Sequence, residues 1–145
     1  DVNATTLSKE TVDEFIRLAD YVAVNDYEGK MLEEKTGKPL AELARMVKAL
    51  VVTKGAEGSS IHADGQRHDI PSVKPEAVVD PTGCGDAYRS GLLYGIAEGH
   101  DWPTTGRLAS LMGAIKVASR GGQNHSVTRV EIGRRFAAAF GRNIW

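Results

Sequence analysis

The sequence has little cysteine, no long apolar run and no excess of basic residues, and each of these features excludes a class of protein. The sequence has one cysteine in 145 residues, which excludes an intrachain disulfide framework and a zinc site built on cysteines. No apolar run approaches the roughly 18 residues of a membrane-spanning helix, so we expect no membrane partner. Basic residues are not in excess, with 18 Lys and Arg against 19 Asp and Glu, which argues against a nucleic-acid partner. The first residues lack the basic and apolar regions of a signal peptide, so we expect a cytoplasmic protein.

Glycine is the residue that is over-represented. The sequence has 16 glycines in 145 residues, which is about 11%, against an average of about 7% in proteins. This excess indicates tight turns or a close approach of the backbone to a ligand. No internal repeat or linker divides the chain, and its length is that of one domain. We therefore predict a single α/β domain over residues 1–145.

Apolar residues follow strand and helix patterns in alternation along the chain. Continuous apolar runs at 21–24 and 50–53 predict buried strands of a parallel sheet covered by helices on both faces. Apolar residues at helical spacing predict helices before, between and after these strands. The predicted helices cover 8–19, the segment between Asn25 and Gly37, 40–47, the region of 92–96, 108–118 and 132–140.

A hairpin interrupts the parallel pattern. Residues 59–63 and 67–70 flank Asp64-Gly65, which is the strongest short hairpin signal. Residues 77–79 predict a last short strand. The chain is therefore predicted to form an α/β sheet that is mostly parallel and contains one antiparallel hairpin.

The most informative segment is 80–91, Asp-Pro-Thr-Gly-Cys-Gly-Asp-Ala-Tyr-Arg-Ser-Gly. It lies between a predicted strand and a predicted helix. Backbone N–H groups at the start of that helix, together with the helix dipole, favour an anion. A carboxylate repels a bound anion, so its presence here calls for an explanation. One explanation is that Asp86 acts as a general base on a substrate hydroxyl. The alternative is a simple turn in which Asp86 is a first-turn residue favoured by the dipole.

This segment resembles the second signature of the ribokinase-like (PfkB) sugar and nucleoside kinases, Asp-Thr-x-Gly-Ala-Gly-Asp. The resemblance extends from about residue 19 to about residue 140. It implies a three-layer αβα, Rossmann-like sheet of which this chain is the C-terminal portion. Three further pieces occur in the family's order: Asn25-Asp-Tyr-Glu28, similar to its Asn-x-x-Glu motif; Thr53-Lys-Gly-Ala-Glu-Gly58, similar to its Thr-x-Gly-x-x-Gly nucleotide turn; and Gly121-Gly-Gln123, similar to its loop beside the adenine.

The resemblance implies the catalytic residues. Asp86 matches the general base that takes the proton from a primary hydroxyl of the acceptor. Gly83, Cys84 and Gly85 match the anion hole for the transferring phosphoryl group. Cys84 stands where the family commonly has alanine, and we interpret it as a small buried thiol. The implied reaction is transfer of the γ-phosphoryl group of ATP to a sugar or nucleoside such as ribose or adenosine. The wording of the signature is most similar to bacterial adenosine-kinase-like members.

The resemblance also implies the nucleotide-binding residues. Thr53, Gly55 and Gly58 match the turn that holds the ribose and phosphates of ATP. Gly122 and Asn124 match the loop that faces the adenine. The alternatives are an ordinary turn at a strand end and a helix C-cap, and the glycines fit either interpretation.

Metal ions enter in two places. Asn25 and Glu28 have the spacing of a capping box, and the resemblance gives Glu28 a role through water on the Mg²⁺ that accompanies ATP. Both interpretations can hold together. The resemblance implies a monovalent cation, such as K⁺, at Asp80, Thr82 and the loop 120–126.

Other charged side chains are interpreted as surface groups. Lys54 occupies a position that varies in the family, and we interpret it as a solvated charge rather than a phosphate ligand. Arg129, Arg134 and Arg135 are predicted to form a solvated helix face. The four histidines show no metal-binding spacing.

The N-terminal half of the family is not matched by these 145 residues. By resemblance, that half supplies a Gly-Gly signature, the first strands, the acceptor pocket and a lid that often makes a dimer. We therefore expect this segment to need that half or a dimer partner, and to bind ATP weakly by itself. The alternative function is a non-catalytic nucleotide-binding or assembly module, which would have no need for the Asp86 carboxylate.

Overall fold

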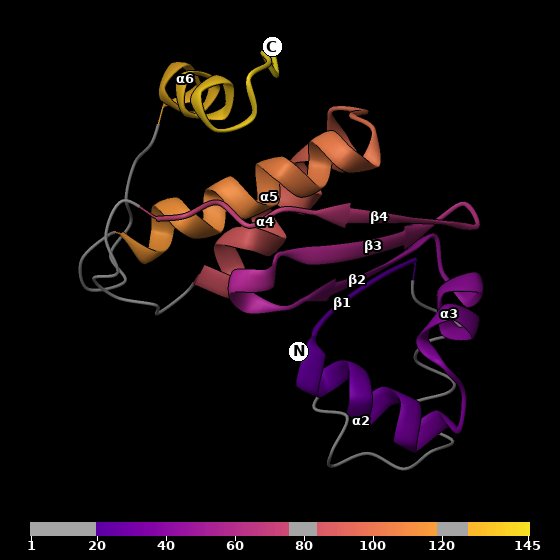
Figure 1. Cartoon of the computed structure of the whole chain (residues 1–145). Coiled ribbons are helices and arrows are strands. Elements are labelled where there is room, and N and C mark those ends of the chain that lie inside the picture. The colour runs from indigo at the N-terminus through magenta and orange to yellow at the C-terminus, as the bar shows by residue number, and fades with distance from the viewer. Residues whose placement is uncertain (1–19, 76–83, 119–127) are drawn as a thin grey trace. The chain divides into compact units, whose positions relative to one another are not determined.

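The computed structural model describes residues 20–75, 84–118 and 128–145 (Figure 1). The described residues form two compact units. The first holds residues 20–55 and 59–69, and the second holds 56–58 and the described residues from 70 onward. This division does not decide whether the units fold together, so the single domain over 1–145 stays a prediction.

A four-stranded sheet with the order β1-β2-β3-β4 is the centre of the first unit. β1 (Tyr21–Asn25) pairs parallel with β2 (Ala49–Thr53). β2 pairs antiparallel with β3 (Ser59–Ala63), and β4 (Gln66–Ile70) is the other neighbour of β3. The predicted strands and the predicted hairpin are confirmed, with ends that differ by one residue.

The hairpin turn has the backbone that its sequence predicts. Asp64 has φ 54° and Gly65 has φ 73°. Two consecutive positive φ angles are typical of the two-residue turn whose twist matches that of the flanking strands. Aspartate and glycine are among the residues that enter this region at low cost.

Two helices follow β1. α2 (Asp26–Thr36) is capped by Asn25 and ends at Gly37, whose φ of 69° is left-handed. α3 (Leu40–Leu43) is one turn long and continues as a 3₁₀ turn at 44–46. The predicted helix over 40–47 is therefore wrong in its extent. A helix this short, which begins after Pro39 without a side-chain cap, makes few backbone hydrogen bonds of its own, and Val47 is already extended on the way into β2.

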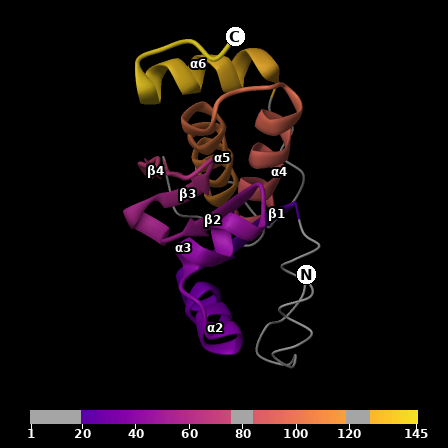
Figure 2. The same ribbon diagram turned by 90° about the vertical axis from the view of Figure 1, so that its right-hand side faces the viewer.

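The core of the first unit lies between the sheet and these helices. α2 and α3 lie on the same side of the sheet (Figures 1 and 2). Leu50 and Val52 are two residues apart on β2 and therefore share one face of the sheet. They pack with Val22 of β1, Leu32 of α2 and Leu43 of α3. Full burial of each such side chain contributes about 1.5–3 kcal/mol.

Three helices make the second unit: α4 (Cys84–Ala97), α5 (Trp102–Val117) and α6 (Arg129–Phe140). The three predicted helices are confirmed, but each begins before its apolar pattern does: α4 at 84 rather than 92, α5 at 102 rather than 108, and α6 at 129 rather than 132. α5 begins at the N-cap Asp101 with a proline in its first turn, a position where proline costs little. The core of this unit joins α5 to α6 and consists of Leu108, Leu111, Ile115, Phe136 and Ile144.

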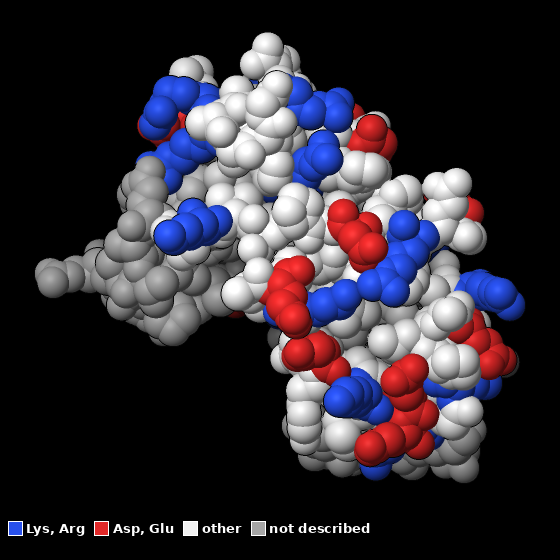
Figure 3. Space-filling model, in the orientation of Figure 1, with Lys and Arg blue, Asp and Glu red and all other residues white. Residues whose placement is uncertain are grey.

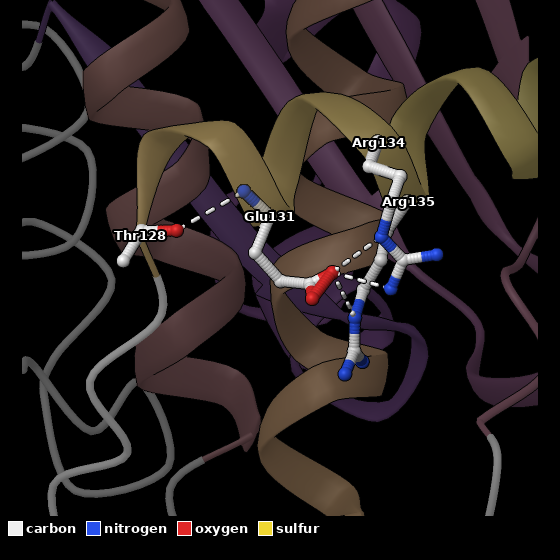
Figure 4. A network of polar contacts seen from close by, with 4 residues as sticks. All are labelled: Thr128, Glu131, Arg134 and Arg135. Carbon is white, nitrogen blue, oxygen red and sulfur yellow. Dashed lines mark hydrogen bonds and ion pairs between the residues drawn. The ribbon is translucent and has the colours of Figure 1, made fainter.

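The arginines of α6 are more engaged than predicted. The hydroxyl of Thr128 accepts the backbone N–H of Glu131 at 3.1 Å and caps the helix. The Glu131 carboxylate accepts Arg134 Nε at 2.9 Å and lies 3.6 Å from Arg135 Nε (Figure 4). The guanidinium of Arg129 stacks on the ring of Trp145, 4.1 Å from its centroid. The side chains of Arg129 and Arg134 are 58% and 67% exposed, as predicted for a solvated face, whereas that of Arg135 is only 25% exposed.

Some predicted elements lie outside the described residues, namely the helix over 8–19, the strand at 77–79 and the break at 121–122. Within the described ranges, no helix is both long enough and apolar enough to cross a membrane. Acidic and basic side chains are interspersed over the face shown in Figure 3.

Candidate functional site

The carboxyl ends of β1 and β2 bring two predicted site residues together. Asn25 and Thr53 are paired in register as the last residues of these parallel strands. The hydroxyl of Thr53 donates to the backbone oxygen of Val24 at 3.5 Å. In open α/β sheets, ligands bind outside the carboxyl ends of the strands, so this edge is the place in the first unit where a ligand is expected.

Asn25 and Glu28 form a complete capping box at that edge. Asn25 Oδ1 accepts the backbone N–H of Glu28 at 2.7 Å, and Glu28 Oε1 accepts the backbone N–H of Asn25 at 2.9 Å. The capping interpretation is confirmed. Among the described residues, the capping box uses one carboxylate oxygen of Glu28, Oε1. The magnesium role of Glu28 and Asn25 stays a prediction.

The donor set at this edge fits magnesium better than a metal held by protein alone. Magnesium usually keeps several waters and takes one or two carboxylates in addition to substrate phosphates. No group of three or more His, Cys, Asp or Glu side chains within the described ranges could hold a metal ion. The half-buried Glu28 carboxylate, near the end of β2 where Thr53 pairs with Asn25, is compatible with such water-mediated binding.

The turn after β2 requires glycine at two positions. Gly55 has φ 60° and Gly58 has φ 90°. A Cβ atom at Gly58 would lie 2.1 Å from the backbone oxygen of Ile70, so no other residue fits there without moving the backbone. This requirement belongs to the fold and does not by itself show a nucleotide.

Lys54, in the same turn, is not the solvated charge that we predicted. Its Nζ donates to the hydroxyl of Ser60 on β3 at 2.7 Å. The half-buried lysine is held at β3 because the buried Ser60 hydroxyl offers it an acceptor.

The helix predicted to hold an anion begins inside the signature. α4 starts at Cys84, so Gly85 and Asp86 lie in its first turn. The N–H groups of a first turn have no intrahelical acceptor and favour an anion. Gly85 has open space around it, since the nearest atom to an added Cβ is Arg89 Nη1 at 4.0 Å. Packing therefore does not demand glycine at this position, whereas a ligand that approaches the backbone would.

Asp86 is an exposed carboxylate, and Arg89 is its charged neighbour within the part of the chain that the structure describes. Its side chain is 84% exposed, and Oδ1 lies 3.4 Å from Arg89 Nη1. The sequence interpretation missed Arg89, although its position three residues after Asp86 on a helix is a signal for an ion pair. The guanidinium adds positive charge beside the helix N-terminus.

The predicted site residues are divided between the two compact units, or they lie outside the described ranges. The side chain of Cys84, together with Gly83, Asp80, Thr82, Gly122 and Asn124, falls outside what the structure describes. Asn25, Glu28, Thr53 and Gly55 belong to the first unit, and Gly58, Gly85 and Asp86 belong to the second. The roles assigned to all of these residues stay predictions.

Comparison with known proteins identifies the family. The family model for pfkB family carbohydrate kinases matches residues 2–129. The chain belongs to this family. A nucleoside kinase of Methanocaldococcus jannaschii is 31% identical over 121 residues, which are 83% of this chain and 40% of that protein.

Solved structures of family members confirm the fold class. The nucleoside kinase of Burkholderia thailandensis in complex with inosine has a TM-score of 0.92 and 50% identity, over 97% of this chain and 47% of that one. The same kinase in complex with ADP-inosine also has a TM-score of 0.92. This pfkB chain therefore has the predicted ribokinase-like α/β fold and spans less than half the length of these relatives.

Proposed function

We propose that the protein containing this pfkB chain is an ATP-dependent kinase that phosphorylates a primary alcohol of a nucleoside or a sugar. Asp86 is the general base. The observation that carries the proposal is the exposed Asp86 carboxylate in the first turn of α4, within a signature that the family match covers. A turn that only binds phosphate gains nothing from a negative charge at this point.

The reaction follows from the chemistry of these groups. Asp86 accepts the proton of the acceptor hydroxyl while that oxygen forms a bond to the γ-phosphorus of ATP. The bond from this phosphorus to the bridging oxygen breaks and leaves ADP. Backbone N–H groups of residues 83–85 stabilise the charge on the transferring phosphoryl group. Most of the rate acceleration comes from positioning the two substrates and neutralising the charge of the phosphates, because phosphoryl transfer requires little covalent chemistry from the protein.

The residues proposed to bind the cofactors are those that match the family's motifs. Thr53, Gly55 and Gly58 hold the ribose and phosphates of ATP, and Gly122 and Asn124 face the adenine. Mg²⁺ would neutralise the phosphate charges when bound. Glu28 and Asn25 would hold it through water, and Asp80 and Thr82 would hold a monovalent cation such as K⁺.

A nucleoside is the favoured acceptor. The support is the 50% identity with a nucleoside kinase whose structure contains inosine, together with the 31% identity with the nucleoside kinase of Methanocaldococcus jannaschii. The test is a screen of inosine, adenosine, cytidine, ribose and fructose with ATP and Mg²⁺. Preferential turnover of the free sugars would contradict a nucleoside acceptor.

Asp86→Asn tests the general base directly when it is made in the full-length protein. Removing a general base lowers the rate by about 10²–10⁴-fold, whereas ATP binding should be kept or strengthened because a negative charge beside the phosphates is lost. Rapid-quench turnover and calorimetric ATP binding measure the two effects. Asp64→Asn, which removes an exposed carboxylate from the hairpin turn, is the matched control and should change neither quantity.

The second candidate function is a non-catalytic nucleotide-binding or assembly module. It would bind ATP without turnover of any acceptor, and Asp86→Asn would then leave every measured activity unchanged. Loss of ATP binding and turnover together in that variant would instead mean that Asp86 maintains the structure of the turn.

A further inference from the structure

A chain of hydrogen bonds joins the nucleotide turn to the hairpin. Lys54 Nζ donates to Ser60 Oγ at 2.7 Å, and Ser60 Oγ donates to Asp69 Oδ1 at 3.0 Å. Arg67 Nε donates to the same carboxylate oxygen at 2.9 Å. These hydrogen bonds connect Lys54, the residue after β2, with the second residue of β3 and the fourth residue of β4.

The hydroxyl of Ser60 accepts a hydrogen bond from Lys54 and donates one to Asp69. Ser60 is only 1% exposed, and a buried hydroxyl needs partners. A serine hydroxyl has one proton to donate and lone pairs to accept with. Here the proton goes to Asp69 and the lone pair receives Lys54, so each partner uses a different part of the group. An exposed ion pair can adopt many geometries, whereas a buried hydroxyl between the two charges specifies one.

The groups at the two ends of this hydrogen-bond chain, Lys54 and Asp69, are both charged. Hydrogen bonds from Arg67 and then Ser60 hold the pKa of Asp69 below its usual range. Asp69 is therefore a carboxylate at neutral pH, as acceptance of both bonds requires. Lys54 is held at the other end by a bond that a charged donor makes stronger than a neutral one would.

The turn that follows Lys54 contains a 3₁₀ turn at Gly55–Glu57, and the Ser72 hydroxyl donates to the backbone oxygen of Ala56 at 2.8 Å. Gly55 and Gly58 both have positive φ, and glycine has the widest choice of backbone conformations of any residue. A turn of this composition needs anchors outside itself. The hydrogen bond from Lys54 to Ser60 is one such anchor. It lies directly after the strand end where Thr53 pairs with Asn25.

We infer that Lys54, Ser60 and Asp69 form a positioning relay that fixes residues 53–55, the start of the turn after β2, in their ligand-binding shape. The inference rests on the proposed function, because the ligand of this turn is the ribose and phosphate portion of ATP. Lys54 is a positioning residue, since its ammonium group points at β3 and acts through the backbone of the turn. Loss of any member raises the KM for ATP and leaves kcat nearly unchanged.

The first experiment measures amide hydrogen exchange of peptides covering residues 53–58 in the full-length protein. Lys54→Met, Ser60→Ala and Asp69→Asn should each increase exchange in this turn, and the double variant of Lys54 and Asp69 should increase it no further than the larger single effect. Lys54→Arg, which keeps a charged donor, should restore protection. Asp64→Asn removes a carboxylate from the same hairpin and should change nothing. Unchanged exchange in Lys54→Met would overturn the relay.

The second experiment measures steady-state kinetics with ATP as the varied substrate. Lys54→Met and Asp69→Asn should raise the KM for ATP by about fivefold, the factor that corresponds to about 1 kcal/mol, with kcat changed less than about twofold. A large fall in kcat at constant KM would overturn the inference, because it would make Lys54 a group that acts on the reacting phosphate. A wild-type protein without kinase activity would overturn the proposed function, and the exchange experiment would still decide the relay.

Discussion

Gly91 of α4 lies against the backbone of Ala109 of α5 so closely that a Cβ atom at Gly91 would be 2.7 Å from Ala109 Cα. Four residues later, a Cβ at Gly95 would meet the Thr105 hydroxyl at 2.6 Å. Residues four apart share one face of a helix, so α4 presents a strip without side chains to α5. The helix that carries Asp86 therefore lies close to α5 at these two glycines, against the backbone of Ala109 and the side chain of Thr105.

Gly91→Ala should destabilise the protein because the added methyl group has no space. Overpacking of this kind typically costs about 1–3 kcal/mol, and urea denaturation measures it as a lower midpoint. Gly85→Ala is the matched control on the same helix, since the nearest atom to its added Cβ is 4.0 Å away. The control should be neutral or stabilising by up to about 1 kcal/mol, because alanine is the better helix former. Equal midpoints for Gly91→Ala and wild type would contradict the close packing.

Glu28→Gln separates the capping role of Glu28 from its proposed metal role. Glutamine can still accept the backbone N–H of Asn25, as in a capping box, so the free energy of unfolding should stay within about 0.5 kcal/mol of wild type. The loss of charge should raise the Mg²⁺ concentration needed for half-maximal turnover. Glu34→Gln, an exposed change on the same helix, is the control for both measurements.

Asn25→Ala completes this test, because it removes the other half of the box and should cost about 1 kcal/mol. A Glu28→Gln variant with normal Mg²⁺ dependence would reduce Glu28 to a helix cap.

Asp101 should make stability depend on pH through its capping of α5. Its Oδ1 accepts the backbone N–H of Thr104 at 2.8 Å, and hydrogen bonds from the side chain and then the backbone of Thr104 lower its pKa. A carboxyl group with a lowered pKa in the folded state contributes stability above its unfolded pKa of about 3.9. That contribution is lost as the pH falls through the lower, folded value.

The free energy of unfolding of Asp101→Asn, compared with wild type between pH 7 and about pH 3, measures this dependence. The variant should be less stable than wild type at pH 7, and the difference should shrink toward acid. Asp64→Asn should show a smaller change over the same range. A difference that grows toward acid would have the wrong sign and would exclude the assigned cause.

Local patterns were enough to place most elements and part of the site. Asn25 and Glu28 were recognised as a capping box because their partners are three residues apart in the chain. Asp64-Gly65 predicted the hairpin because positive φ at two adjacent positions suits few residues. The start of α4 within the signature followed from glycines before an apolar helical pattern, and the signature itself indicated the family.

Tertiary structure alone decided the contacts between residues that are distant in sequence. Lys54 was misjudged because its acceptor, the Ser60 hydroxyl, becomes available only when β3 lies beside β2. Helical spacing over 40–47 overstated α3, because the chain must extend at Val47 to enter β2. Periodicity records which side chains are apolar, and it holds no information on which strand will lie opposite. The sequence by itself therefore determined the family, the turns and the helix caps. Packing determined which acceptor Lys54 finds and how closely α4 meets α5.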